Sequence, residues 1–202
     1  MKKFKSEELI DQLEQDIRQI IAAAEHLKTA DPIKLNYTSK EGTWSVAQTL
    51  EHLNLYNRHY LPIIEKSMVH ITKDLSAWFV PGFWGNYFTR MISPTNVYEI
   101  KNKMKTGKAF IPSKGENVDA VFSEFLQHQN KYLHILEVAR RRNLNNIRIP
   151  VSISRFIRLK LGDILRFLVA HQQRHMIQAR NALKAVGIST DKFPVILEAV
   201  KL

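Results

Sequence analysis

Four long stretches of this chain repeat apolar residues at spacings of three and four, and this periodicity constrains the fold more than any other feature. The pattern predicts four amphipathic helices, each with an apolar stripe that must be buried against another element. The predicted helices span about residues 6–27, 43–71, 118–141 and 161–186. Helices of this kind pack around a common core, so we expect an all-α fold, a four-helix bundle.

Local signals mark the ends of the predicted helices. Glu7 and Glu8 stand in the first turn of the first helix, where negative charge complements the helix dipole. Thr43 or Ser45 can cap the second helix, and Gly187 is placed to end the fourth. Seven glycines and seven prolines in 202 residues favour long helices over a β-sandwich rich in tight turns.

A long connection, about residues 73–117, separates the second and third predicted helices. A loop of this length inside a compact domain is either functional or packed by its own side chains. The aromatic residues within 75–92 are Trp78, Phe79, Phe83, Trp84, Tyr87 and Phe88. Packing against the helices is the simplest interpretation, and a lid over a pocket, a dimer contact and a contact with a membrane surface are the alternatives. We expect residues 1–202 to form a single domain with this long crossover between helices two and three.

The composition excludes several classes of function. The sequence contains no cysteine, so disulfides, thiolate metal sites and a cysteine nucleophile are impossible, and a bound metal must use His, Asp or Glu. No signal-peptide pattern and no run of about 18 apolar residues is present, which predicts no transmembrane segment and a cytoplasmic location. The net charge of +11 could attract nucleic acid. No nucleic-acid-binding signature accompanies it, so a solvated basic face is the preferred interpretation.

His171 and His175 lie four residues apart on the fourth predicted helix and therefore project from one face. The apolar stripe of that helix continues onto both positions, which assigns the two rings to the interior. Each buried ring nitrogen needs a partner, and a shared divalent cation satisfies one nitrogen of each ring. The alternative is a pair of hydrogen-bonded core histidines. The residues between them do not fit the H-E-x-x-H motif of zinc proteases, because Gln172 stands where that motif has its glutamate.

Two histidines leave a metal ion under-coordinated, so a third ligand is expected elsewhere in the chain. His52 lies at the edge of the apolar stripe of the second predicted helix, and His59 follows on nearly the same face. Periodicity alone does not choose between them. The histidines that remain as candidates are His26, His52, His59, His70, His128 and His134.

Three motifs in this order resemble the DinB-like (DinB/YfiT-like) family of metalloenzymes. They are W-S-x-x-x-x-x-x-H-L from Trp44 to Leu53, K-M-K-T-G-K-A-F-I-P-S at residues 103–113, and F-L-x-x-H-x-x-R-H-x-x-Q from Phe167 to Gln178. The resemblance covers about residues 6–187. It implies a bundle whose helices run up, down, down and up, with a divalent metal ion at one end. By these motifs the ligands are His52, His171 and His175, which implies His52 rather than His59.

The resemblance also implies the cofactor and the partners. The metal of the family is typically nickel or zinc, with manganese or iron in some members, and family members are often homodimers. Characterised relatives include transferases of low-molecular-weight thiols and a thiol-dependent isomerase. We therefore expect a small-molecule substrate, with a thiol as cosubstrate.

Three neutral imidazoles around a dication leave a position open for water or substrate, as in catalytic zinc sites. Such a metal lowers the pKa of bound water from ~15.7 to ~7, or binds a thiol as the more nucleophilic thiolate. No general base is evident beside the predicted ligands, because Glu51 adjoins His52 but points about 100° away around the helix. This favours a thiol transferase. A metal-dependent hydrolase and a non-enzymatic, nucleic-acid-associated binding protein are the alternatives.

Three further residues are candidates for the surroundings of the metal. Gln178 follows His175 by about one turn, and Gln129 projects into the interior from the third predicted helix. Either amide could orient a ligand or a water molecule, although Gln129 can instead bridge helices. Tyr56, one turn after His52, is a candidate for the pocket wall, and plain packing is the alternative.

Overall fold

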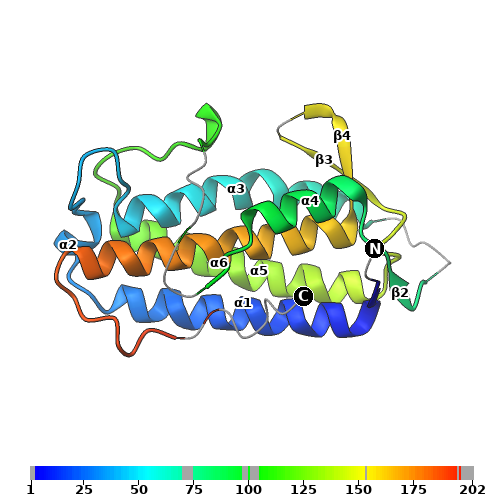
Figure 1. The fold of residues 1–202 in the computed structure, drawn as a ribbon, viewed down its shortest axis with the longest axis horizontal. Helices are drawn as coiled ribbons and strands as arrows, with labels where there is room; N and C mark the ends of the chain where they lie inside the picture. Colours follow the sequence, from blue (N-terminus) through cyan, green and yellow to red (C-terminus); the bar gives the residue numbers. More distant parts are fainter. Residues whose placement is uncertain are drawn as a thin grey trace.

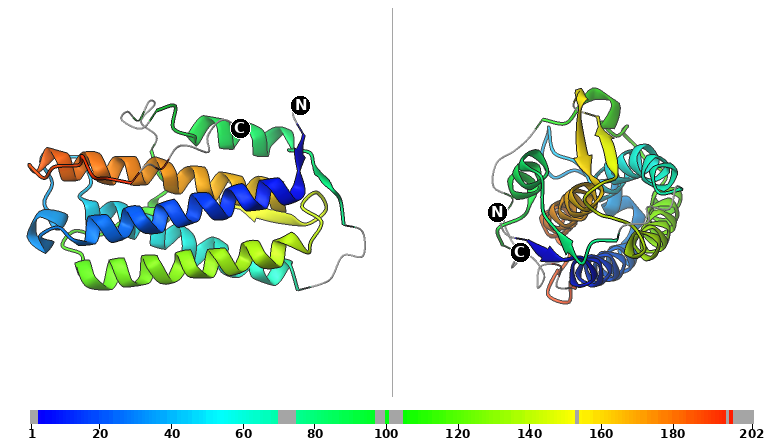
Figure 2. Two further views of the ribbon diagram at one scale, coloured as in Figure 1. Left: turned by 90° about the horizontal axis from the view of Figure 1, so that it is seen from below. Right: turned by 90° about the vertical axis from the view of Figure 1, so that its right-hand side faces the viewer.

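The computed structural model of this chain is mainly helical, and it describes residues 3–69, 75–96, 100, 105–152, 154–194 and 196. Within these residues, four long helices lie side by side (Figure 1). They are α1 (Ser6–Lys28), α3 (Val46–Ser67), α5 (Val118–Arg140) and α6 (Leu161–Ala185). In Figures 1 and 2, α1 and α6 run in one direction and α3 and α5 in the other. The all-α prediction is therefore broadly confirmed.

Capping decides where the long helices begin and end. The Ser45 hydroxyl accepts a hydrogen bond from the backbone N–H of Gln48, and the Gln48 side chain accepts one from the N–H of Ser45. Ser45 is therefore the cap of α3, whereas Thr43 donates its hydroxyl hydrogen to the carbonyl of Lys40. The α3 helix ends at Ser67, so the predicted end at residue 71 is too late. The candidate His70 lies outside the described residues.

The described part of the chain contains shorter elements that the apolar periodicity did not predict. They are α2 (Pro32–Asn36), α4 (Phe83–Ile92), the 3-10 helix η1 (Lys108–Phe110), and the strands β1 (Phe4–Lys5), β2 (Trp78–Phe79), β3 (Arg148–Val151) and β4 (Ser154–Lys160). Strands β1 and β2 form one antiparallel pair, and β3 and β4 form another. The connection between α3 and α5 thus holds a helix of its own, α4, which packs on α6 (Figure 2).

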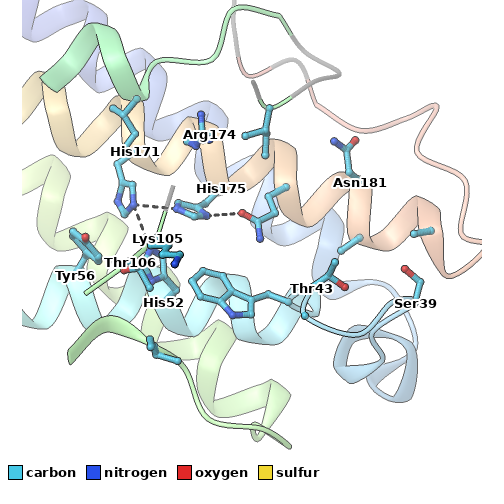
Figure 3. A pocket seen from close by; sticks show the side chains of 18 of the residues that line it. Ser39, Thr43, His52, Tyr56, Lys105, Thr106, His171, Arg174, His175 and Asn181 are labelled. Carbon is cyan, nitrogen blue, oxygen red and sulfur yellow. Dashed lines mark hydrogen bonds between the residues drawn. The ribbon is translucent and has the colours of Figure 1, made fainter. Parts of the chain in front are cut away.

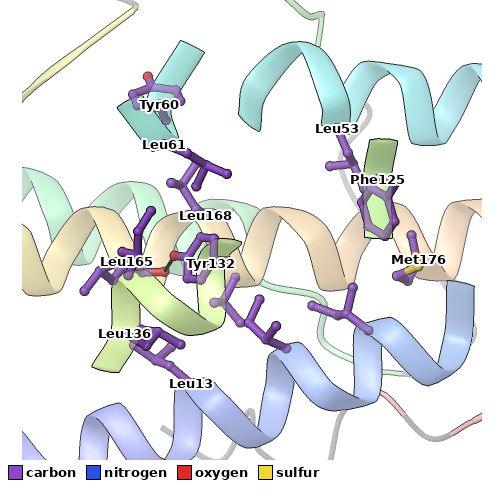
Figure 4. Close-up of a cluster of buried hydrophobic side chains, with 14 of the residues drawn as sticks. Leu13, Leu53, Tyr60, Leu61, Phe125, Tyr132, Leu136, Leu165, Leu168 and Met176 are labelled. Carbon is purple, nitrogen blue, oxygen red and sulfur yellow. Dashed lines mark hydrogen bonds between the residues drawn. The ribbon is translucent and has the colours of Figure 1, made fainter. Parts of the chain in front are cut away.

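The core fills the space between the long helices (Figure 4). Phe125 and Tyr132 of α5 are fully buried, and the Tyr132 hydroxyl donates a hydrogen bond to the carbonyl of Leu165 at 2.9 Å. Leu53 and Met176 are also buried here, and each directly follows a candidate ligand in the sequence. Core packing therefore fixes the rotation of α3 and α6, and with it the direction of the neighbouring histidines. None of the helices described is both long and apolar enough to cross a membrane.

Asp16 is a carboxyl group buried on α1, with 3% of its surface exposed. Its hydrogen bond comes from the Gln12 amide at 3.4 Å. Burial raises the pKa of Asp16 from 3.8 to about 7. At a pH between these two pKa values, the carboxyl group of Asp16 has lost its proton in the unfolded chain but keeps it in the folded protein. The free energy of unfolding should therefore fall as the pH rises through this window.

Asp16→Asn removes this ionisation and is expected to raise the free energy of unfolding by about 2 kcal/mol near pH 8. The gain is smaller than the full pKa shift implies, because a buried amide also loses hydration. Near pH 4 the gain should largely disappear, since the folded carboxyl is then neutral. Urea unfolding at both pH values measures the effect, with Glu25→Gln at an exposed position of α1 as the control. An equal gain at both pH values would contradict the buried carboxyl as its cause.

Candidate metal centre

Three imidazole rings meet inside the protein, one from α3 and two from α6 (Figure 3). Nε2 of His171 lies 3.0 Å from Nε2 of His175 and 3.3 Å from Nε2 of His52. One ligand atom from each ring lies within 4.8 Å of the other two. His52, His171 and His175 are buried, with 1%, 3% and 9% of their surfaces exposed. The structure thus brings together the three histidines that the motifs indicated.

Hydrogen bonds on the outer side of two rings fix their tautomers. Nδ1 of His52 lies 2.6 Å from the backbone carbonyl oxygen of Phe110, which can only accept. Nδ1 of His175 lies 3.0 Å from the amide oxygen of Gln178. Each Nδ1 therefore carries the proton and each Nε2 carries a lone pair. These lone pairs point toward His171, the arrangement that outer partners impose on metal-binding histidines.

No tautomer of His171 satisfies this cluster by itself. A proton on its Nε2 can be donated well to only one of the two facing lone pairs. A proton on its Nδ1 has no acceptor in the part of the chain that the structure describes. Each buried polar atom left without a partner costs about 1–3 kcal/mol. A cation bound between the rings would accept all three lone pairs, so the donor set fits a divalent metal ion.

Protonation of the rings does not supply the missing hydrogen bonds near neutral pH. Burial lowers the pKa of His52 to about 4, although the carbonyl of Phe110 partly opposes the shift. Burial also lowers the pKa of His171 and of His175 well below the ordinary value of histidine, and charge on the neighbouring rings lowers both further. The three rings are therefore neutral at pH 7, the protonation state that metal binding requires.

A pocket of about 720 Å³ opens beside the three rings. The Trp44 ring lies 4.7 Å from that of His52, and the Tyr56 ring lies 4.4 Å from that of His171, measured between centroids. The side chains of Lys105 and Arg174 also line the pocket (Figure 3). No described residue of the lining is an aspartate or a glutamate. The walls thus combine aromatic and positively charged side chains with aliphatic and neutral polar ones.

Of the three residues predicted to surround the metal, two line the pocket and one does not. Gln178 and Tyr56 line the pocket, and Gln178 is bonded to His175. Gln129 is fully buried on α5 away from the pocket lining. Neither atom of its amide has a hydrogen-bond partner among the described residues, so the structure shows no bridge between helices there.

The other histidines of the described chain lie apart from the three-ring cluster. His59 is exposed, and its ring contacts those of Tyr60 and Phe110. Glu51 accepts a hydrogen bond from Arg58 at 2.8 Å and is not part of the pocket lining, in agreement with the direction that the helix geometry predicted. His26, His128 and His134 contact Phe193, Asn54 and Glu137 respectively.

Sequence reasoning missed several contributors to the pocket. Lys105 belongs to a motif that signalled the family, but its distance from the histidines in the sequence gave no sign that it reaches the pocket. Trp44 was quoted for the same reason and proves to cover His52. The carbonyl of Phe110 acts through the backbone, so no residue type could have indicated it.

Comparison with known proteins gives one match. A family model described as the DinB superfamily matches residues 12–179, which include all three histidines and most of the four long helices. No curated protein and no solved structure matches the chain.

Proposed function

Because the chain belongs to the DinB superfamily, we propose that it is a metalloenzyme in which His52, His171 and His175 hold one divalent metal ion. The observation that carries the proposal is the set of three buried rings whose facing Nε2 atoms no tautomer can satisfy. Nickel or zinc is the expected metal, with manganese and iron as alternatives. The donor set contains only imidazole nitrogen, which suits these transition metals better than magnesium or calcium.

The fold supports this proposal. The two helix directions in Figures 1 and 2 agree with the up, down, down and up order of the family. We therefore propose that the four long helices form a four-helix bundle within a single domain, with the ligands facing each other from α3 and α6. A homodimer, as in relatives of the family, is part of the same proposal.

For the reaction, the pocket favours a transferase that uses a low-molecular-weight thiol. A bound metal ion would act as a Lewis acid that lowers the pKa of a thiol or a water molecule. The described lining offers no carboxylate to take a proton from water, so hydrolysis would need a base from elsewhere. Lys105 and Arg174 add positive charge, which suits a thiol that also carries a carboxylate.

The remaining residues of the pocket hold and shield this arrangement. The carbonyl of Phe110 and the amide oxygen of Gln178 keep His52 and His175 in the tautomer that presents Nε2 to the cluster. Trp44 and Tyr56 cover two of the rings and exclude water from their faces. A substrate would enter through the open side of the pocket, between these aromatic walls and the cationic side chains.

Elemental analysis of the purified protein, followed by a screen of small thiols against a panel of electrophiles, tests the proposal. We expect one divalent ion per chain and the joint consumption of thiol and electrophile. A protein that holds no stoichiometric metal after growth in metal-supplemented medium would overturn the metal centre. A reaction that proceeds equally well without thiol would overturn the transferase and favour the hydrolase.

Gln178→Ala is expected to weaken metal binding by about 10–100-fold, because Nδ1 of His175 loses the acceptor that orients the ring. Gln178→Glu keeps an oxygen at this position and should retain most of the affinity. Titration of the metal-free proteins with zinc, in competition with a chromophoric chelator, measures the difference. Equal loss in both variants would show that the orienting hydrogen bond is not the cause.

A further inference from the structure

The helix α4 presents three of its four aromatic residues to solvent, while Phe88 packs partly against the core. Gly85 and Thr89 lie on the buried side, together with Ile92. Phe83 and Trp84 are 70% and 51% exposed, and Tyr87 is 50% exposed. An ordinary surface helix has the opposite arrangement, with its large apolar residues toward the core.

Contacts with α6 hold α4 in this orientation. The backbone N–H of Gly82, the residue before the first turn, donates a hydrogen bond to Asp163 Oδ2 at 2.9 Å. A Cβ atom at Gly85 would lie only 2.1 Å from Cγ of Asp163, so the close approach requires glycine at this position. Phe83, Trp84 and Tyr87 therefore cannot turn inward while α4 keeps its place on α6.

Three exposed rings and the half-buried ring of Phe88 form a continuous surface, which we call the aromatic face, made of Phe83, Trp84, Tyr87 and Phe88. The centroids of Phe83 and Trp84 lie 5.2 Å apart, and those of Tyr87 and Phe88 lie 5.5 Å apart. Trp84 joins the two pairs, with its ring 5.9 Å from that of Phe88. A contiguous exposed apolar surface of this kind marks a site of contact with another surface.

Positively charged residues lie on α4 and beside the segment that leads into it. Lys3 Nζ lies 4.3 Å from the centre of the Trp78 ring, and Lys160 donates a hydrogen bond to the carbonyl of Val80. Arg90 is exposed on α4 itself. The described stretch 75–96 contains no acidic residue, and the whole chain carries a net charge of +11.

We propose that the aromatic face docks on the surface of an anionic lipid bilayer. Tryptophan, tyrosine and phenylalanine favour the boundary between headgroups and acyl chains, and flanking lysine and arginine residues bind anionic headgroups. A second copy of the chain fits less well, because it would bring the same cations face to face. Ile92, at the end of α4, lines the pocket, so docking would place the pocket close to the membrane. The proposal does not depend on the metal centre.

Cosedimentation with vesicles tests this proposal on the full chain. Vesicles of phosphatidylcholine that contain phosphatidylglycerol are compared with vesicles of phosphatidylcholine alone. The wild type is expected to bind the anionic vesicles at least about tenfold more strongly. The double variant Phe83→Ser with Trp84→Ser should lose about tenfold of this binding, and Arg90→Gln about fivefold. Ile33→Ser, at a 78% exposed position on α2, is the matched control and should change nothing.

Three results would overturn the proposal. They are equal partitioning onto both kinds of vesicle, unchanged binding in the double variant, and a lipid-independent dimer in analytical ultracentrifugation that the double variant abolishes. The last result would assign the aromatic face to self-association instead. Because both substituted side chains are exposed, the circular dichroism spectrum and melting temperature of the double variant should match those of the wild type.

Discussion

His171→Ala is expected to leave the protein without stoichiometric metal and to lower its affinity for divalent ions by more than about 100-fold. His171 is the central ring of the three, since its Nε2 lies 3.0 Å and 3.3 Å from the Nε2 atoms of the other two. Without it only two ligands are left, fewer than structural or catalytic zinc sites use. Elemental analysis and zinc titration of the variant measure the loss.

His134→Ala is the matched control, because the side chain of His134 is 66% exposed on α5. It should retain one ion per chain. The metal-free forms of both variants should also be unfolded in urea, so that loss of metal is separated from loss of folding. For the wild type, saturating metal at about 100 times its Kd should add about 2.7 kcal/mol to the free energy of unfolding, and this increment should vanish in His171→Ala. A variant that keeps its ion would refute the three-histidine centre.

Asp163→Ala is expected to lower the free energy of unfolding by about 3–5 kcal/mol. Asp163 and Arg166 are 1% and 5% exposed, and their charged groups lie 3.9 Å apart. Nε and Nη1 of Arg166 have no hydrogen-bond partner among the described residues, so the carboxylate is an important source of compensating charge. Its removal strands a buried guanidinium and also takes the acceptor from the N–H of Gly82.

Asp163→Asn separates the two contributions. It retains an oxygen that can accept from Gly82 but removes the negative charge, so it should reproduce the electrostatic part of the loss alone. Glu25→Ala on the exposed side of α1 is the control and should change the free energy of unfolding by less than about 0.5 kcal/mol. Urea denaturation followed by circular dichroism gives the values. A loss below about 1 kcal/mol in Asp163→Ala would mean that water, rather than Asp163, compensates Arg166.

The long helices were predictable because each buries a continuous stripe of large side chains. The observed bounds of α1, α5 and α6 differ from the predicted ones by one residue at most, whereas α3 begins three residues later and ends four residues earlier than predicted. The helix α4 was not predicted, because its buried side includes the small residues Gly85 and Thr89 while Phe83, Trp84 and Tyr87 face outward. A pattern that equates apolar with buried cannot recognise such a helix. The β3–β4 pair was not predicted for a different reason, because buried and more exposed residues alternate along β3 with the period of two that is typical of a strand.

Some residues of the candidate site could likewise be predicted from the sequence, and others could not. His171 and His175 were visible from spacing on one helix, whereas the choice of His52 required the resemblance to a family, because His59 has nearly the same phase. The pocket wall depended on where residues 105–113 return to the helices, which no local pattern encodes. The tertiary placement of residues 105–113 and the backbone contact from Phe110 could therefore not be predicted from the sequence.

The distance along the chain between His52 and His171, 119 residues, has a consequence for the path of unfolding. A metal ion bound to both rings would close a loop that contains the aromatic connection and the whole of α5. In a cysteine-free sequence it would act as a reversible crosslink, comparable in its entropic effect to a disulfide across a loop of about 100 residues, about 4.7 kcal/mol. Chelation would then reopen that loop and accelerate unfolding, without any change to a covalent bond.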